Sequence, residues 1–165
     1  MKVVVLGGGK GQSSLLRALK RYDELDLSAI VTVADDGGST GRLREEFNIP
    51  AMGDIRNVML SLAESETLLG DIMNYRFKDD IRSQLAGHNL GNLILTALTD
   101  TTGNFMDAIT SVSKVLSVKG TIIPSSEDTI VLCARMSDGT IIRGESNIPI
   151  YQNHIQEVYY DVYVE

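Results

Sequence analysis

Cysteine, histidine and proline are scarce in this sequence of 165 residues, and each scarcity excludes a class of protein. The single cysteine, Cys133, excludes a disulfide framework and a zinc site built from cysteines, which is typical of a reducing cytoplasm. His88 and His154 are the only histidines, and no metal-ligand spacing links them. Because only three prolines occur and no linker is visible, we expect a single nucleotide-binding domain over residues 1–165.

Long hydrophobic runs and an excess of positive charge are missing as well. No segment approaches the roughly 20 apolar residues of a membrane span, and the first apolar run, Val3–Leu6, is too short for the core of a signal peptide. The 15 Lys and Arg residues are outnumbered by 22 Asp and Glu residues, which argues against general nucleic-acid binding. We therefore expect a cytoplasmic protein with no membrane span and no nucleic-acid partner.

Hydrophobic patterning predicts an α/β fold. The run Val3–Leu6, a glycine-rich loop and a helix over residues 13–22 lead to a second strand over residues 28–34, which makes a βαβ unit. Four stretches at helical spacing follow, within residues 53–64, 65–77, 87–98 and 104–116. After Gly120 the pattern changes to strand-like runs at residues 121–124, 129–136, 139–144 and 158–164, with a tight-turn signal at Ser137-Asp138-Gly139.

This order of elements favours a Rossmann-like parallel sheet with helices on both faces, followed by a C-terminal antiparallel hairpin region. Two parallel strands are fewer than a doubly wound sheet normally has, so we expect the sheet to be incomplete in this chain.

The glycine-rich loop is the first candidate binding element. Glycine has no Cβ, so backbone N–H groups and the following helix N-terminus can approach a phosphate closely. The spacing is not the full G-x-G-x-x-G because of Gln12, and it is not a P-loop because Gly11 follows Lys10. A tight turn without a ligand is the alternative. The candidate residues are Gly7, Gly8, Gly9, Lys10, Gly11 and Gln12.

Two adjacent carboxylates, Asp35 and Asp36, follow the second predicted strand. An acid at this position of a dinucleotide-binding unit accepts hydrogen bonds from ribose hydroxyls. The other acid either binds Mg²⁺ or caps the turn that follows. Three arginines nearby, Arg42, Arg44 and Arg56, form either a basic pocket for a phosphorylated ligand or part of a solvated charge mixture. We expect both aspartates to lie beside the glycine loop at the carboxyl edge of the sheet.

Polar residues also stand at the starts of predicted helices. Asp54 is either the N-cap of its helix or a ligand contact beside Asn57, and Asn104 is the expected cap of the fourth helical stretch. His88 and Asn92 are four residues apart, so we expect them to share a helical face. They either line a ligand cleft or make structural hydrogen bonds near the helix start.

Taken together, these segments resemble the gluconeogenesis factor (YvcK-like) family, which belongs with the CofD-like phospholactate transferases to one superfamily. The matching stretches occur in family order and span nearly the whole chain. They are "VVVLGGGKG", "VTVADDGGSTGRLR", "GDIRNVMLSLAE", "MNYRF", "GHNLGNLILTALT", "VSKVLSVKGTIIPSS" and "DGTIIRGESNIP".

The resemblance implies a bacterial cytoplasmic regulator that binds a nucleotide-sugar of the UDP-N-acetylglucosamine type, needs no cofactor, and links gluconeogenic growth to cell-wall synthesis and cell shape. Two alternatives are a CofD-like transferase, which moves a phospholactyl-type group from a nucleotide diphosphate to a hydroxyl with Mg²⁺ on Asp35 and Asp36, and an NAD-dependent oxidoreductase. By position, the family's ligand site falls on Gly7, Gly8, Gly9, Gly11, Asp35, Asp36, Ser39, Asp54, Asn57, His88, Asn89 and Asn92.

The chain departs from the family pattern in two ways. Family members usually read "GGGTGL" where this chain reads "GGGKGQ", so Lys10 either meets a phosphate directly or crowds the loop. The family is also about twice as long and carries a later "GPGSLYTS"-type loop. We therefore expect an N-terminal portion or a truncated member, with apolar surface left bare and self-association or dependence on a C-terminal half. One such surface is the face of the last strand that carries Val158, Tyr160, Val162 and Val164.

Overall fold

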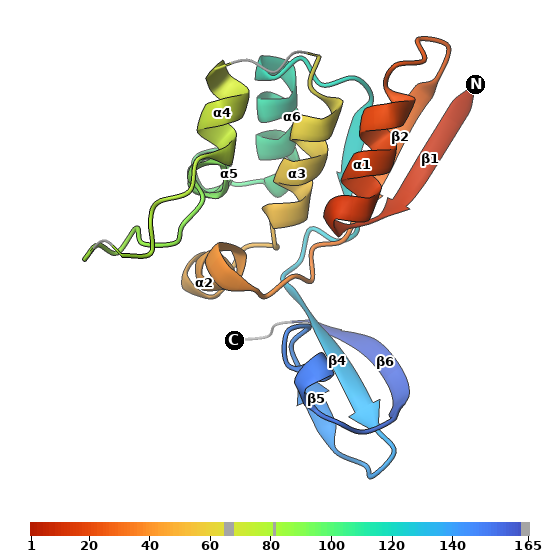
Figure 1. Cartoon of the computed structure of the whole chain (residues 1–165), viewed down its shortest axis with the longest axis vertical. Helices are drawn as coiled ribbons and strands as arrows, with labels where there is room; N and C mark the ends of the chain where they lie inside the picture. Colours follow the sequence, from red (N-terminus) through yellow and green to blue (C-terminus); the bar gives the residue numbers. More distant parts are fainter. Residues whose placement is uncertain (65–67, 81, 163–165) are drawn as a thin grey trace.

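The computed structural model describes residues 1–64, 68–80 and 82–162, and within them it forms an α/β fold (Figure 1). The elements in chain order are β1 (Lys2–Gly7), α1 (Gly9–Leu19), β2 (Asp26–Val31), α2 (Gly38–Phe47), α3 (Gly53–Leu62), α4 (Leu68–Asn74), α5 (Leu90–Thr102), α6 (Phe105–Val115), β3 (Thr121–Pro124), β4 (Ile130–Met136), β5 (Ile141–Arg143), the 3-10 helix η1 (Ile148–Ile150) and β6 (Ile155–Val162). Among the described residues, none of the helices has the length and apolar character that crossing a membrane requires.

The parallel sheet has the strand order β1-β2-β3, so the predicted βαβ unit is confirmed and β2 lies in the middle. In register, Val5 pairs with Ala29, and Ala29 pairs with Ile122 on the other side. The run at residues 121–124 therefore joins the parallel sheet instead of the antiparallel region. The sequence could not separate these two possibilities, because a four-residue apolar run fits either kind of sheet.

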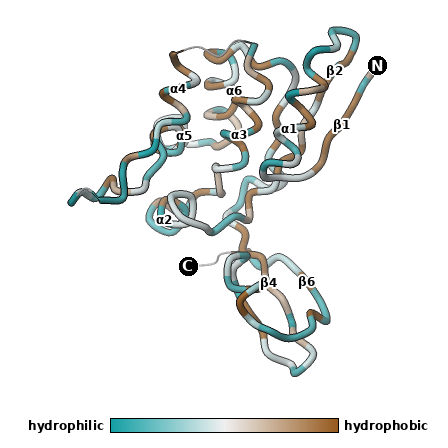
Figure 2. Tube along the Cα trace, viewed as in Figure 1, coloured by the Kyte–Doolittle hydropathy of each residue, from teal (hydrophilic) through white to brown (hydrophobic). Residues whose placement is uncertain are grey.

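The Rossmann-like class is confirmed with one difference: in the described ranges the helices cover one face of the sheet and not both (Figure 1). Along β2, Leu27 and Ala29 are buried under α3, as is Ile122 of β3. On the opposite face, the side chains of Val4 and Leu6 are 55% and 71% exposed. Figure 2 shows the hydrophobic stretch of β1 at the edge of the sheet. Because β1 is apolar at each position from Val3 to Leu6, its pattern does not indicate which face of the sheet is covered.

Helix α3 is the centre of the helical layer, between α1 and the pair α5–α6. Its residues Ile55, Val58, Met59 and Leu62 are fully buried, so the predicted apolar stripe is confirmed. Burial of each such side chain contributes roughly 1.5–3 kcal/mol. The predicted stripe within residues 65–77 forms α4, although residues 65–67 lie outside the described part of the chain.

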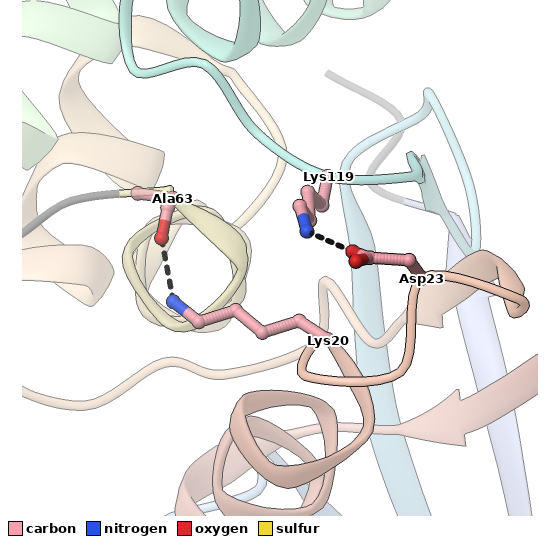
Figure 3. Close-up of polar contacts among 4 residues, drawn as sticks. All are labelled: Lys20, Asp23, Ala63 and Lys119. Atoms are coloured by element: carbon pink, nitrogen blue, oxygen red, sulfur yellow. Dashed lines mark hydrogen bonds and ion pairs between the residues drawn. The ribbon is translucent and has the colours of Figure 1, made fainter.

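Polar contacts hold the amino ends of β2 and β3 against the helices (Figure 3). The Lys20 ammonium donates to the Ala63 carbonyl at the end of α3 over 2.5 Å. Lys119, before β3, forms an ion pair of 2.7 Å with Asp23, before β2. The hydrogen bond from Lys119 lowers the pKa of the Asp23 carboxyl. The turn after α1 is thus joined to both α3 and the start of β3.

Strands β5, β4 and β6 form a separate antiparallel sheet that projects away from the helical layer (Figure 1). The predicted hairpin is confirmed: Met136 donates to the Thr140 carbonyl over 2.8 Å, and Gly139 adopts φ +85° in the turn. On β6, Val158, Tyr160 and Val162 are each at least half exposed, as expected for one bare face. Val164, expected on the same face, lies outside the described residues.

Candidate functional site

The glycine loop and the aspartates after β2 meet at the carboxyl edge of the parallel sheet. Strand β2 ends at Val31, three residues earlier than predicted, where its neighbours β1 and β3 also end. The following residues continue without a ladder partner to Asp35 and Asp36. A Cβ added to Gly53 would lie 3.4 Å from an Asp35 carboxylate oxygen, and one added to Gly8 would lie 2.5 Å from the Asp54 carboxylate. The start of α3 therefore joins the glycine loop to Asp35, and the predicted neighbourhood is confirmed for Asp35, whereas Asp36 contacts the loop after β5 through the Ser146 N–H.

The glycines of the loop are needed for different reasons. At Gly8 a Cβ would come within 2.3 Å of the Thr32 methyl group, so the close approach of two segments requires glycine. Gly9 has φ +63°, a left-handed conformation that favours glycine. At Gly11 a Cβ would meet no atom within 4 Å. The loop is therefore tightly packed at Gly8 and open at Gly11, which is the side that a ligand can approach.

Asp54 lies within α3 and does not cap it, because the N-cap is Met52 with no side-chain cap. Burial raises the pKa of the Asp54 carboxyl, while hydrogen bonds from the Gly9 backbone and the Asn57 side chain oppose that rise, and the charge of Asp35 adds to it. Asp54 thus connects α3 to the glycine loop. The prediction that Asp54 is the N-cap of this helix is wrong.

Gln12 and Lys10 point in different directions from α1. The Gln12 side chain is buried, and its Nε2 donates to the carbonyls of Val5 and Ile30, each over 3.0 Å. It joins α1 to the first two strands, while its Oε1 has no partner among the described residues. Lys10 is exposed and lines a groove beside α1. Of these two candidates, Lys10 is the one that a ligand in solution can reach.

Asp35 and Asp36 each hold a different segment of backbone. Asp35 accepts from the Gly37 N–H, and Asp36 accepts from the Ser146 N–H, both over 2.9 Å. Glu145 completes a cluster in which one carboxylate oxygen from each acid lies within 4.8 Å of the others. Burial raises the pKa of the Glu145 carboxyl, and the charges of Asp35, Asp36 and Asp54 add to this effect.

Three carboxylates at this spacing are hard oxygen ligands of the kind that Mg²⁺ accepts, so the cluster fits the predicted magnesium site on Asp35 and Asp36 and adds Glu145 to it. Glu145 stands 110 residues after Asp35 and was not predicted as a site residue. Its position within the matched stretch "DGTIIRGESNIP" was the available signal.

A buried polar network connects α2 to the start of α5. The Ser39 hydroxyl oxygen accepts from the Asn89 N–H over 3.1 Å and lies 3.4 Å from the Asn92 amide nitrogen. It also lies 3.2 Å from His88 Nδ1. The Ser39 hydroxyl and His88 Nδ1 thus share a hydrogen bond whose donor depends on the His88 tautomer. Burial, followed by the charge of Arg42, lowers the pKa of His88.

This network alters the expectation for His88 and Asn92. Helix α5 begins at Leu90, so His88 precedes it and the two residues do not share a helical face. They meet through Ser39 instead. Asn89 is the N-cap of α5, with its Oδ1 accepting from the Asn92 N–H over 3.1 Å. Asn92 is 2% exposed, and its Oδ1 has no partner among the described residues.

Arg56 is a buried cation that sequence analysis placed only in a loose basic group. The residue is 8% exposed, and its Nη2 donates to Asn57 Oδ1 over 2.7 Å. Its Nε and Nη1 have no partner in the described part of the chain. Burial, and then the charge of Arg76, lowers the pKa of Arg56 to about 10. Arg44, in contrast, is buried with its Nη1 donating to two carbonyls.

Comparison with known proteins places this site in a family context. The family model described as 2-phospho-L-lactate transferase CofD matches residues 3–165. The gluconeogenesis factor of Bacillus subtilis is 50% identical over 158 residues, which are 96% of this chain and 49% of that protein. The putative gluconeogenesis factor of Aquifex aeolicus is 53% identical over 154 residues, 92% of this chain and 46% of that protein.

Solved structures agree with the sequence relatives. The crystal structure of protein BH3568 from Bacillus halodurans superposes with a TM-score of 0.91 at 48% identity, and it covers 98% of this chain and 52% of that one. The chain spans about half the length of the curated relatives that it matches.

Proposed function

The chain belongs to the CofD family and is similar to its gluconeogenesis factors, and from this membership we propose that it binds a nucleotide-sugar of the UDP-N-acetylglucosamine type. The diphosphate lies over the open side of the glycine loop, where backbone N–H groups of the α1 N-terminus and Lys10 meet it. The hydroxyls of the ligand lie toward Asp35 and Asp36. This ligand would be bound without turnover.

The observation that carries the proposal is the junction at Asp54. The Asp54 carboxylate lies against the glycine loop, where a Cβ added to Gly8 would be 2.5 Å from it, and Gly53 beside it approaches the Asp35 carboxylate. The glycine loop, to which we assign the phosphates, and Asp35, to which we assign the hydroxyls, thereby lie at one sheet edge, and nucleotide-binding α/β folds use the same arrangement.

The names of the relatives support a regulatory role. Proteins of about 50% identity are named gluconeogenesis factors, which supports a role in gluconeogenic growth. We propose in addition that the protein is a cytoplasmic regulator that adjusts cell-wall synthesis and cell shape to this growth. In this role the nucleotide-sugar reports the supply of wall precursor, and its binding changes the surface that the site presents to a partner protein.

The acidic cluster favours a second candidate, a CofD-like transferase. When bound there, Mg²⁺ would offset negative charge on a transferring phosphate. Asp35, Asp36 and Glu145 would hold the ion, and the buried Ser39–Asn92 pair would orient the ligand beside it. The described residues offer no corresponding observation in favour of an NAD-dependent oxidoreductase.

Calorimetry against a ligand panel tests the proposal. UDP-N-acetylglucosamine should bind this chain, uridine should not, and Asp35→Asn should weaken binding at least about tenfold by removing a charged acceptor. Asp100→Asn, an exposed acid on α5, is the matched control and should bind normally. Absence of binding to any nucleotide-sugar would reject the proposal. Transfer from a nucleotide-linked lactyl phosphate to a hydroxyl acceptor in the presence of Mg²⁺ would favour the transferase.

A further inference from the structure

A polar groove runs along α1 where this helix faces α3 and α4. Its volume is about 270 Å³, whereas a single water occupies roughly 30 Å³, so the groove has room for a phosphate group with its water shell. Polar side chains line most of it. They are Lys10, Ser13, Ser14 and Arg17 from α1, Asn57 from α3 and Asn74 from α4.

The charged residues that line this groove are all positive. Lys10 and Arg17 are its charged lining residues, and with Ser13 and Ser14 they stand at positions i, i+3, i+4 and i+7 on one face of α1. Both cations are exposed. In the described part of the chain neither forms an ion pair, whereas Lys119, Arg135 and Arg143 each have a carboxylate partner. On a chain of net charge −7, this groove is therefore locally positive, and its charge attracts anions.

The buried guanidinium of Arg56 is an independent observation. Its stem passes Gly91, where an added Cβ would lie 2.8 Å from Arg56 Cδ and 2.4 Å from the Met73 carbonyl. Its head donates to Asn57 Oδ1, and Asn57 lines the groove, so the guanidinium is joined to the groove through Asn57 although Arg56 is not itself a lining residue. The Asp54 carboxylate is a nearby charge that attracts it. Two of its nitrogens have no partner among the described residues, and no carboxylate forms an ion pair with it there. A buried cation in this state gains from a nearby anion.

We propose that the groove between α1, α3 and α4 is a phosphate site, in which Lys10 and Arg17 ion-pair with phosphate oxygens, Ser14 donates a hydrogen bond, and the nearby Arg56 adds positive charge. Because Lys10 belongs both to the glycine loop and to the groove, the phosphates of the ligand extend from the loop along α1, away from Asp35 and Asp36. Only the identity of the molecule that carries the phosphate rests on the proposed function.

Titration calorimetry with inorganic pyrophosphate and with UDP-N-acetylglucosamine tests this site on the intact chain. Both should bind, and Arg17→Gln should weaken each at least about tenfold, as expected for the loss of one charge-assisted contact. Lys10→Gln should act in the same direction. Arg21→Gln removes the same charge from an exposed position beyond the end of α1, outside the groove lining, and should change affinity by less than about twofold.

The outcomes separate this inference from the proposed function. If pyrophosphate binds in an Arg17-dependent manner while no nucleotide-sugar binds, the phosphate site stands and the proposed function falls. If the nucleotide-sugar binds equally well to the wild type, Arg17→Gln and Lys10→Gln, the groove is not a phosphate site although the function stands. If Arg17→Gln and Arg21→Gln weaken binding equally, the effect is general charge attraction, and the proposed phosphate site is wrong. Failure of both ligands to bind would reject both proposals.

Discussion

The Asp36 carboxylate accepts a hydrogen bond from the backbone N–H of Ser146 over 2.9 Å, although 110 residues separate them. This contact joins the segment after β2 to the loop after β5 and brings Glu145 beside Asp35. Arg44 supports the same junction from α2, since its Nη1 donates to the carbonyls of Ala34 and Ile130. The antiparallel sheet is thereby anchored at the candidate site, at the end from which β4 leaves.

Replacing Asp36 with alanine should release this loop. The Ser146 N–H would lose a charged acceptor, a contact worth about 1.5–3 kcal/mol, so its hydrogen exchange measured by NMR should accelerate at least about tenfold. Asp36→Asn keeps an acceptor oxygen and should retain most of the protection. Unchanged exchange in Asp36→Ala would show that the loop holds its place without the carboxylate.

Two neighbouring glycines should respond differently to the same substitution. Gly8→Ala places a Cβ 2.3 Å from the Thr32 methyl and 2.5 Å from the Asp54 carboxylate, and overpacking of this kind costs about 1–3 kcal/mol. Gly11→Ala meets no atom and lies within α1, so it should be neutral or stabilise by up to about 1 kcal/mol. Urea unfolding of the two variants measures the difference. Equal stabilities would contradict the packing described for Gly8.

Asn92→Ala should lower the stability of the fold. The Asn92 amide lies 3.4 Å from the Ser39 hydroxyl and 3.3 Å from the Thr40 hydroxyl in a buried setting, and leaving such groups without partners costs about 1–3 kcal/mol. Gln156→Ala, at an exposed position of β6, is the control. Thermal unfolding checks the result; a normal melting temperature combined with weak nucleotide-sugar binding would instead assign Asn92 to the ligand cleft alone.

Stability should fall as the pH drops below about 6.5, the ordinary value for histidine. Burial and the Arg42 charge lower the pKa of His88 in the folded protein, so the unfolded chain takes up the proton at higher pH. The loss begins near the unfolded pKa and is complete below the folded one. Urea midpoints at several pH values measure it. His88→Gln should flatten the slope, whereas His154→Gln, at an exposed position, should not.

The bare face of the parallel sheet should promote self-association. Val4 and Leu6 are 55% and 71% exposed on this face, which has no helical cover in the described ranges. Sedimentation should therefore depend on concentration, and a dye for apolar surface should bind. Val4→Thr combined with Leu6→Gln should reduce both signals, while Val115→Gln, at an exposed position on α6, should leave them unchanged. A compact monomer with little dye binding would contradict the expectation.

The sequence correctly predicted those elements that depend on residues close together along the chain. The βαβ unit, the stripe on α3 and the Asn104 cap of α6, whose Oδ1 accepts from the Asp107 N–H over 2.9 Å, all follow from neighbours in sequence. Asp54 is a residue for which local sequence does not predict the role. Its type and position fit an N-cap, but its carboxylate serves the glycine loop, because a distant contact outweighed the local one.

The parts of the site that could not be predicted depend on contacts across the fold. Glu145 reaches Asp35 only because a separate sheet brings it back to the edge of the first sheet. The four-residue spacing of His88 and Asn92 predicts a shared helical face, but His88 precedes α5. The two residues meet instead through Ser39, which lies on α2. Arg56 gave no signal of burial, since arginine is mostly exposed in proteins.

The central position of β2 has a consequence for the order of folding. Ser28 pairs with Val4, 24 residues before it, and with Thr121, 93 residues after it. Closing the longer loop costs about 1.2 kcal/mol more chain entropy than closing the shorter one. We therefore expect the β1–α1–β2 unit to assemble before β3 joins the sheet. Until β3 pairs, β2 offers an open edge, and we expect chains at that stage to be the ones most prone to pair wrongly with one another.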